Sequence, residues 1–145
     1  MDGTAWLLGS LDNLCDDTAL AASRWDGPVE AVSEALLEDA GLAVDALFGA
    51  GLNRDLDGKA KAVVEAMQGR ASAGTLTIAA IDIPSGVDGD SGQIRAASAA
   101  AALTVTFFRA KPGHLLLPGR EFCGDLWVVD IGIPESTLDS IAPAQ

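Results

Sequence analysis

The chain is poor in the residues that build metal centres and nucleic-acid sites. It contains one histidine, His114, and two cysteines, Cys15 and Cys123, which are not spaced as metal ligands. A zinc site with several imidazoles is therefore excluded, and we expect both cysteines to be reduced core residues. Only 9 Lys and Arg stand against 21 Asp and Glu, a formal net charge of -12. This balance argues against a nucleic-acid partner, because phosphate binding depends on clustered basic side chains.

Long apolar runs are also missing from the 145 residues. No run approaches the roughly 20 residues of a membrane span, so no membrane partner is predicted and a cytoplasmic location is expected. Hydrophobic residues make up 49% and charged residues 21%, which is typical of a globular domain. Residues 1–57 hold 12 acidic and 2 basic side chains, whereas residues 58–145 hold 9 and 7. An anionic ligand is therefore better tolerated in the second part of the chain.

What is present is an alternation of short apolar blocks with helical patterns. Helices are predicted from Val29 to Leu37 (opened by Pro28), from Ala60 to Met67 (with Asp57 as N-cap), and in the alanine-rich segment 96–102. Such alternation predicts crossover connections and a parallel sheet in an α/β layered fold, with ligands beyond the carboxyl ends of the strands. The expected strands are residues 5–8, 42–48, 76–83, 103–108 and 126–131, the second of them covered on both faces.

A glycine-rich turn follows the strand at 42–48. Gly49 and Gly51 allow backbone N–H groups to approach a ligand closely, and Arg54 is placed to pair with a phosphate. The dinucleotide fingerprint GxGxxG fails because position 54 is not glycine. A simple turn is an equally good interpretation of this segment.

Asp45 lies inside that same apolar strand. A buried carboxylate is costly unless it is hydrogen-bonded, paired or bound to a cation, and the neighbouring sequence offers no Lys or Arg. Either a cation or backbone donors must compensate its charge. From this residue alone, a structural role is as well supported as a binding role.

Two further polar residues follow strand ends. Asp82, between two isoleucines and before Pro84, is predicted to have a raised carboxyl pKa suited to acid–base work, although an Asp that stabilises its own turn is the alternative. Lys111 follows the strand at 103–108 and can deliver an ammonium to the same edge, although a solvated Lys is commoner. His114 is a candidate base, but a lone His in a loop is more often a surface residue.

Several motifs follow one another along the chain, at residues 45–52, 82–88 with the Gly92 loop, 103–107, 111–113 and 130–134. Taken in this order, they resemble the NAD(P)H-hydrate epimerase family, the YjeF N-terminal domain. The resemblance runs from about Trp6 to Pro134 and implies a Rossmann-like three-layer α/β/α sandwich with a mainly parallel sheet. It also implies interconversion of the R and S epimers of hydrated NADH and NADPH, in cofactor repair with a fused or separate dehydratase.

Residue by residue, the resemblance assigns Asp45 and Ser85 to a potassium ion. Asp82 and Lys111 become the catalytic candidates. The implied reaction is acid-assisted loss of the C6 hydroxyl to a ring iminium, followed by addition of water from the other face, with Asp82 moving the proton. The substrate-binding residues implied are Gly49, Ala50, Gly51, Leu52, Asn53, Arg54, Asp55 and Asp82.

One family feature is missing from the sequence, the Asn-Asn-Gly-Gly-Asp-Gly loop after a first strand. We therefore expect residues 1–134 to form the domain without that strand and loop, incomplete at the N-terminal side, and residues 135–145 to form a tail or linker. A fragment of this kind is expected to have reduced or no activity and an exposed central sheet edge. The alternative function is a non-catalytic Rossmann-like binding or scaffold module, and a homodimer is a possible assembly.

Overall fold

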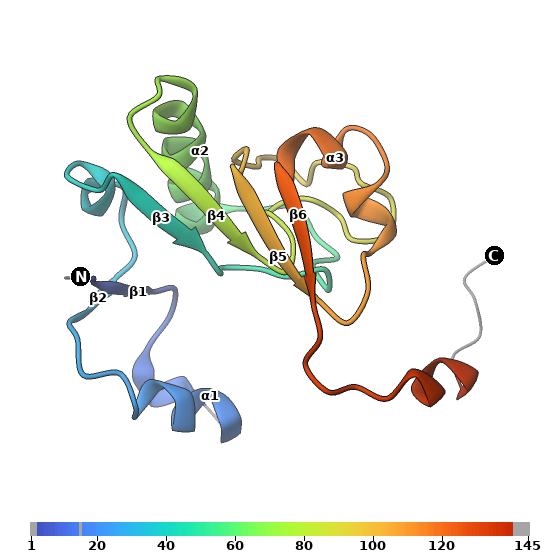
Figure 1. Cartoon of the computed structure of the whole chain (residues 1–145). Helices are drawn as coiled ribbons and strands as arrows, with labels where there is room; N and C mark the ends of the chain where they lie inside the picture. The colour runs from blue at the N-terminus through green and yellow to red at the C-terminus, as the bar shows by residue number, and fades with distance from the viewer. Residues whose placement is uncertain (1–2, 15, 141–145) are drawn as a thin grey trace.

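A four-stranded parallel sheet forms the centre of the molecule (Figure 1). The computed structural model describes residues 3–14 and 16–140. The strand order is β3-β4-β5-β6, so each strand pairs with the next one along the chain. All four carboxyl ends therefore lie at one edge of the sheet. The strands are β3 (Leu42–Asp45), β4 (Thr77–Ile81), β5 (Leu103–Phe107) and β6 (Asp125–Val129).

Helix α2 (Gly58–Ser72) packs on one face of this sheet and carries the crossover from β3 to β4. The helical stripe read from the sequence is confirmed, since Ala60, Val63, Val64 and Met67 are all buried. Val63, Val64 and Met67 lie with Ile78 and the other core residues in one apolar cluster. Asp57 occupies the N-cap position, but its side chain makes no capping hydrogen bond.

The opposite face of the sheet is open to solvent. Leu42, Val44 and Trp127 are 57%, 62% and 63% exposed, whereas Ala43 and Asp45, which point the other way, are buried. The expectation that this strand is covered on both faces is therefore wrong. The α/β class and the parallel sheet are as predicted, but the described residues supply one helical layer rather than the two of a three-layer sandwich.

The N-terminal part forms a separate two-stranded parallel sheet of β1 (Ala5–Leu7) and β2 (Val29–Ala31), with helix α1 (Asp16–Ala22) between them in sequence. In Figure 1 this part lies below β3. Trp6 of β1 packs against the core cluster that contains the buried α2 residues. β3 pairs only with β4 among the described residues, so its other edge is unpaired, in line with the expected exposed edge.

A helix over 29–37 was predicted, and this prediction is wrong. The segment begins as β2 because its backbone bonds to β1, with Val32 N–H donating to the Leu7 carbonyl at 3.0 Å. Only then does it turn into a 3-10 helix, Glu34–Leu37. Val32 and Leu37 are buried, as the apolar spacing requires, but Val29 is 40% exposed. The pattern therefore identified part of the core but not the backbone conformation.

The predicted helix at 96–102 is also wrong, because this segment is irregular. Its N–H groups bond to other elements instead of to one another. The N–H of Ala100 donates to Gln68 of α2 at 2.7 Å, and that of Ala102 donates to Ile78 of β4 at 2.8 Å. Small side chains such as Ala99, which is fully buried, let the chain run between α2 and the sheet.

The remaining elements are short. A 3-10 turn, Pro112–His114, and helix α3 (Gly119–Phe122) connect β5 to β6, and a 3-10 helix, Glu135–Ser140, begins the predicted tail. Cys123 is a buried free thiol, whereas Cys15 and residues 141–145 lie outside the described part. Among the described residues, every helix is too short or too polar to cross a bilayer.

A glycine after β4 makes the first test of this packing. Gly86 has φ +92°, and a Cβ built on it would lie 1.8 Å from the Ala97 carbonyl oxygen. We expect Gly86→Ala to lower the free energy of unfolding by about 1–3 kcal/mol, because the clash adds to a strained backbone. Gly69→Ala in α2, where nothing lies within 4 Å, is the control and should raise it by about 0.5–1 kcal/mol. Urea unfolding measures the free energy of unfolding of both variants. Equal values for the two would contradict the close approach of Gly86 to Ala97.

Candidate active site

Asp82 follows β4 directly and occupies an unusual backbone conformation. Its φ is +68°, in the left-handed region, which costs of order 1–3 kcal/mol for a residue with a side chain. The backbone is held there by its own N–H, which donates to the Val105 carbonyl of β5 at 2.7 Å. This kink turns the chain away from the sheet and presents the carboxylate at the edge where the strands end.

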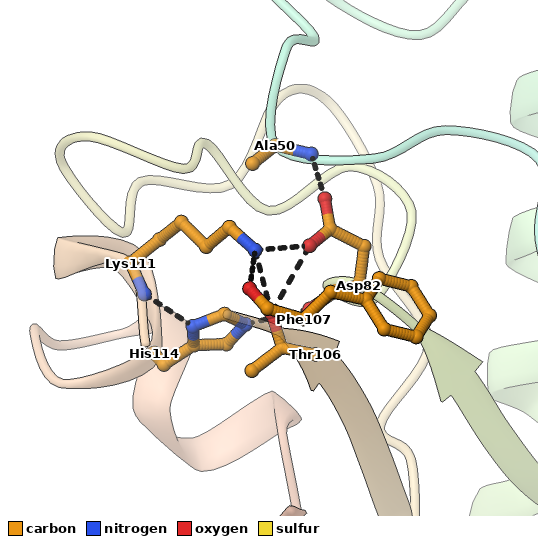
Figure 2. Close-up of polar contacts among 6 residues, drawn as sticks. All are labelled: Ala50, Asp82, Thr106, Phe107, Lys111 and His114. Atoms are coloured by element: carbon orange, nitrogen blue, oxygen red, sulfur yellow. Dashed lines mark hydrogen bonds and ion pairs between the residues drawn. The ribbon is translucent and has the colours of Figure 1, made fainter. Parts of the chain in front are cut away.

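Three groups from three segments surround that carboxylate (Figure 2). Its Oδ2 accepts the Ala50 N–H at 2.9 Å. Its Oδ1 accepts the Thr106 hydroxyl at 3.0 Å and the Lys111 Nζ at 2.5 Å. Lys111 Nζ also donates to Thr106 Oγ1 at 2.7 Å, which closes a triangle of polar atoms. The sequence predicted the convergence of Asp82, the glycine turn and Lys111, and the structure brings them together.

Thr106 was missed by the sequence reading. It lies on β5, is fully buried, and shares the covered face of the sheet with Thr104. The signal was the alternation of Thr104 and Thr106 with apolar residues in this strand, because period-two alternation places both hydroxyls on one face. One of them, Thr106, reaches the strand's carboxyl end and therefore the site.

The electrostatics of Asp82 differ from the sequence-based expectation. Burial opposes ionisation of the carboxyl, but the hydrogen bonds from Lys111 and Ala50, the Lys111 charge and the Thr106 hydrogen bond outweigh it. Together they hold the pKa of Asp82 below its ordinary value, so the predicted rise in pKa is wrong. Asp82 is consequently an ionised carboxylate at neutral pH.

The absence of a side chain at Gly49 lets the turn approach this carboxylate. A Cβ built on Gly49 would lie 2.8 Å from Asp82 Oδ2. A side chain there would push apart the turn and the carboxylate that accepts the Ala50 N–H. At Gly51, in the same turn, a built Cβ meets nothing within 4 Å. The two predicted glycines thus have different roles, and only Gly49 is constrained by Asp82.

The other predicted substrate residues lie a few positions further on. Leu52, Arg54 and Asp55 line a cavity of about 250 Å³ between the turn and the start of α2. Asn53 is exposed beside it. The segment 49–55 is therefore divided, with residues 49–51 at Asp82 and Leu52, Arg54 and Asp55 around the neighbouring cavity.

Asp45 and Ser85 form a second, deeper polar centre. They are 1% and 0% exposed. The Asp45 carboxylate accepts the Ser85 N–H at 2.8 Å, the Ser85 hydroxyl at 2.6 Å and the Leu47 N–H at 3.3 Å. Ser85 Oγ in turn accepts the Phe48 N–H at 3.0 Å, which ties this centre to the glycine turn.

Its charge is not balanced by a cationic side chain. None of the ion pairs among the described residues involves Asp45. Burial raises the pKa of Asp45, and the hydrogen bonds from Ser85 and Leu47 offset only part of that rise. The oxygens of Asp45 and Ser85 are the ligand type that hard cations prefer, and a cation would supply the missing compensation.

His114 is buried, only 2% exposed, so its prediction as a surface residue is wrong. Its Nδ1 lies 2.9 Å from the Lys111 backbone nitrogen and its Nε2 lies 2.7 Å from the Asp82 carbonyl oxygen (Figure 2). Burial is the main cause that lowers its pKa. The chain's one imidazole thus belongs to the site, although neither ring nitrogen is open to a substrate.

Comparison with known proteins gives a consistent family. Residues 10–113 match the family described as "YjeF-related protein N-terminus". The chain is 36% identical over 136 residues to the NAD(P)H-hydrate epimerase of Levilactobacillus brevis, a match that covers 92% of this chain and 61% of that protein. It is 46% identical over 110 residues to the bifunctional NAD(P)H-hydrate repair enzyme Nnr of Thermofilum pendens, covering 74% of this chain and 20% of that protein. The chain thus spans about three fifths or less of these relatives.

The role of Gly49 can be tested through the ionisation of Asp82. Gly49→Ala should weaken the Ala50 N–H bond to the carboxylate and so raise the pKa of Asp82, because that bond favours the charged form. Gly51→Ala is the matched control and should leave this pKa unchanged. Carboxyl-carbon NMR titration measures both variants. Equal Asp82 titration in the two would show that the turn does not constrain the carboxylate.

Proposed function

We propose, from the premise that this chain belongs to the YjeF-related protein N-terminus family, that its site interconverts the two epimers of hydrated NADH and NADPH. The observation that carries the proposal is the pair of Asp82 and Lys111, joined at 2.5 Å. Their side chains are 23% and 28% exposed, so both remain within reach of a substrate. A carboxylate and an ammonium at one strand end form a base and an acid side by side.

The reaction needs a proton at the leaving hydroxyl and a base for the returning water. Because Asp82 is ionised, we assign the donated proton to Lys111 Nζ. The C6–O bond breaks as the hydroxyl takes this proton and leaves as water, and the ring-nitrogen lone pair forms the iminium. Water then adds to C6 from the other face, and its proton returns to Lys111 through the Asp82 carboxylate. This route replaces the earlier expectation that Asp82 alone moves the proton.

The turn and the cavity beside it suit the dinucleotide. Gly49 places no side chain against the Asp82 carboxylate, and the space beside Gly51 is open, which leaves room for the nicotinamide ring. Arg54 lies on the adjoining cavity and offers a guanidinium for a phosphate. The reacting ring and the phosphates would then occupy neighbouring parts of one sheet edge, as in other α/β sheets.

Potassium fits the second centre by its chemistry. Asp45 and Ser85 would hold the ion with their side-chain oxygens, and its charge would compensate a carboxylate that is almost fully buried. Bound there, the ion would supply a fixed positive charge behind the glycine turn. An ion that fixes Ser85 would also restrain the glycine turn, because the Ser85 hydroxyl accepts the Phe48 N–H.

The epimerase function is tested on two forms of the protein. One is the 145-residue chain, and the other is a chimera that adds the portion of the Levilactobacillus brevis epimerase outside the 136 matched residues. We expect the chimera to epimerise purified R-hydrate well above the spontaneous rate, and the chain alone to do so far less. Asp82→Asn in the chimera should lower turnover by at least about 10²-fold, the usual contribution of acid–base catalysis.

Asn suits a left-handed backbone, so this variant should fold normally. Asp125→Asn is the matched control, because Asp125 is exposed at the start of β6, at the opposite end of the sheet from the site. Turnover by Asp82→Asn near that of the control would remove Asp82 from catalysis. A chimera that binds the hydrate without epimerising it would favour the non-catalytic binding module.

The potassium proposal predicts a cation-specific gain in stability. At equal ionic strength, potassium should raise the melting temperature above that in tetramethylammonium, because an ion that binds only the folded state stabilises it by about 1.4 kcal/mol at tenfold its Kd. Asp45→Asn should abolish the difference and Asp57→Asn should keep it. Thermal unfolding in the two salts measures the effect, and a difference that survives Asp45→Asn would place the ion elsewhere.

A further inference from the structure

His114 lies between the two proposed catalytic groups and contacts the backbone of each. One ring nitrogen faces the Lys111 backbone nitrogen at 2.9 Å, and the other faces the Asp82 carbonyl oxygen at 2.7 Å. The imidazole is 2% exposed, so a substrate cannot reach it. A general base needs a free ring nitrogen within reach of the substrate, and this ring has none.

The two contacts determine where the ring proton lies. A backbone nitrogen can only donate, so Nδ1 must accept the Lys111 N–H and carry no proton. A carbonyl oxygen can only accept, so Nε2 must carry the proton and donate it to Asp82. The geometry therefore requires a neutral imidazole with its proton on Nε2. A protonated Nδ1 would set two donors against each other at 2.9 Å.

Each contact restrains one side of the acid–base pair. Asp82 sits at φ +68°, a conformation that persists only if the surroundings hold it. Val105 accepts its N–H on one side, and His114 binds its carbonyl on the other. The bond to Lys111 fixes the backbone position from which that side chain reaches back to Asp82 Oδ1.

We propose that His114 is a positioning residue that holds Asp82 and Lys111 in register through one fixed tautomer. This inference rests on the proposed function for its catalytic meaning. The geometric claim does not, because the tautomer and the Lys111–Asp82 pair can be measured without turnover. Small displacements of catalytic groups are costly, since an error of about 1 Å can lower a rate by about 10²-fold.

The first measurement requires no substitution. His114 is the chain's single histidine, so the imidazole signals in a nitrogen-15 spectrum need no assignment. We expect an unprotonated Nδ1 and a protonated Nε2 at neutral pH. A ring with its proton on Nδ1, a rapidly exchanging mixture of tautomers or a doubly protonated ring would overturn the proposal.

The second measurement reports on Lys111 itself. The chain has three lysines, and Lys59 and Lys61 serve as internal references in the same sample. Limited acetylation followed by mass spectrometry gives the relative reactivity of the Lys111 amine. His114→Phe keeps a planar ring and loses both hydrogen bonds. We therefore expect Lys111 to react about tenfold faster, the effect of losing about 1.4 kcal/mol of its hydrogen bonding to the charged Asp82.

Conservative variants separate positioning from packing. His114→Gln can still donate to the Asp82 carbonyl, so its Lys111 should be acetylated more slowly than in His114→Phe. Leu115→Ala, at the exposed neighbouring position, should leave the Lys111 acetylation rate unchanged. In the epimerase chimera, His114→Phe should lower kcat by about 10²-fold with KM within about twofold, because it misplaces groups that act in the transition state. A folded His114→Phe with unchanged Lys111 reactivity and unchanged kcat would overturn the proposal.

An inactive chimera with the expected tautomer and reactivities would contradict the epimerase function alone. It would leave the geometric role of His114 supported.

Discussion

The kink at Asp82 is the constraint on which the rest of the site depends. At this residue the backbone is left-handed, and the carboxylate lies among three segments, which are the glycine turn, β5 and the loop that carries Lys111. The Val105 carbonyl, the Ala50 N–H, Lys111 and His114 each bond to this one residue. Removing the kink would therefore separate groups that lie up to 32 residues away in sequence.

The site consists of two polar centres in which the carboxyl pKa is shifted in opposite directions. At Asp82, donors and the Lys111 ammonium outweigh burial, so the carboxylate ionises readily and stays accessible. At Asp45, burial outweighs the donors, and the described side chains provide no cation. One carboxylate is thus ionised beside a cationic side chain, and the other is buried without one. Ser85, three residues after Asp82, connects the two centres through Phe48 of the glycine turn.

The two faces of the sheet are covered unevenly. Helix α2 buries one face, whereas the other face exposes Leu42, Val44 and Trp127. Exposed apolar area of this kind favours association in water. The acid–base pair avoids this weakness because Thr106 and His114, which support it, lie on the covered side or within the loops and are almost fully buried. The geometry of the pair therefore depends on the better packed half of the molecule.

The sequence by itself determined the α/β class, the parallel strands, the α2 core stripe and the choice of Asp45, Asp82 and Lys111 as candidate residues. These follow from local periodicity and from polar residues placed in or just after apolar runs, which are properties of short segments. Their close approach followed as well, because parallel strands bring their carboxyl ends to one edge. Ser85 was added only by the family resemblance.

Tertiary structure alone decided the features that depend on partners distant in sequence. Residues 29–31 form a strand because β1 offers them a pairing edge. Residues 96–102 are irregular because their N–H groups donate to α2 and β4. The pKa of Asp82 is lowered rather than raised because Lys111, 29 residues away, donates to it. His114 is buried because its ring lies between the backbones of Asp82 and Lys111 and contacts both. No local pattern encodes these contacts, since each arises only when separate segments pack together.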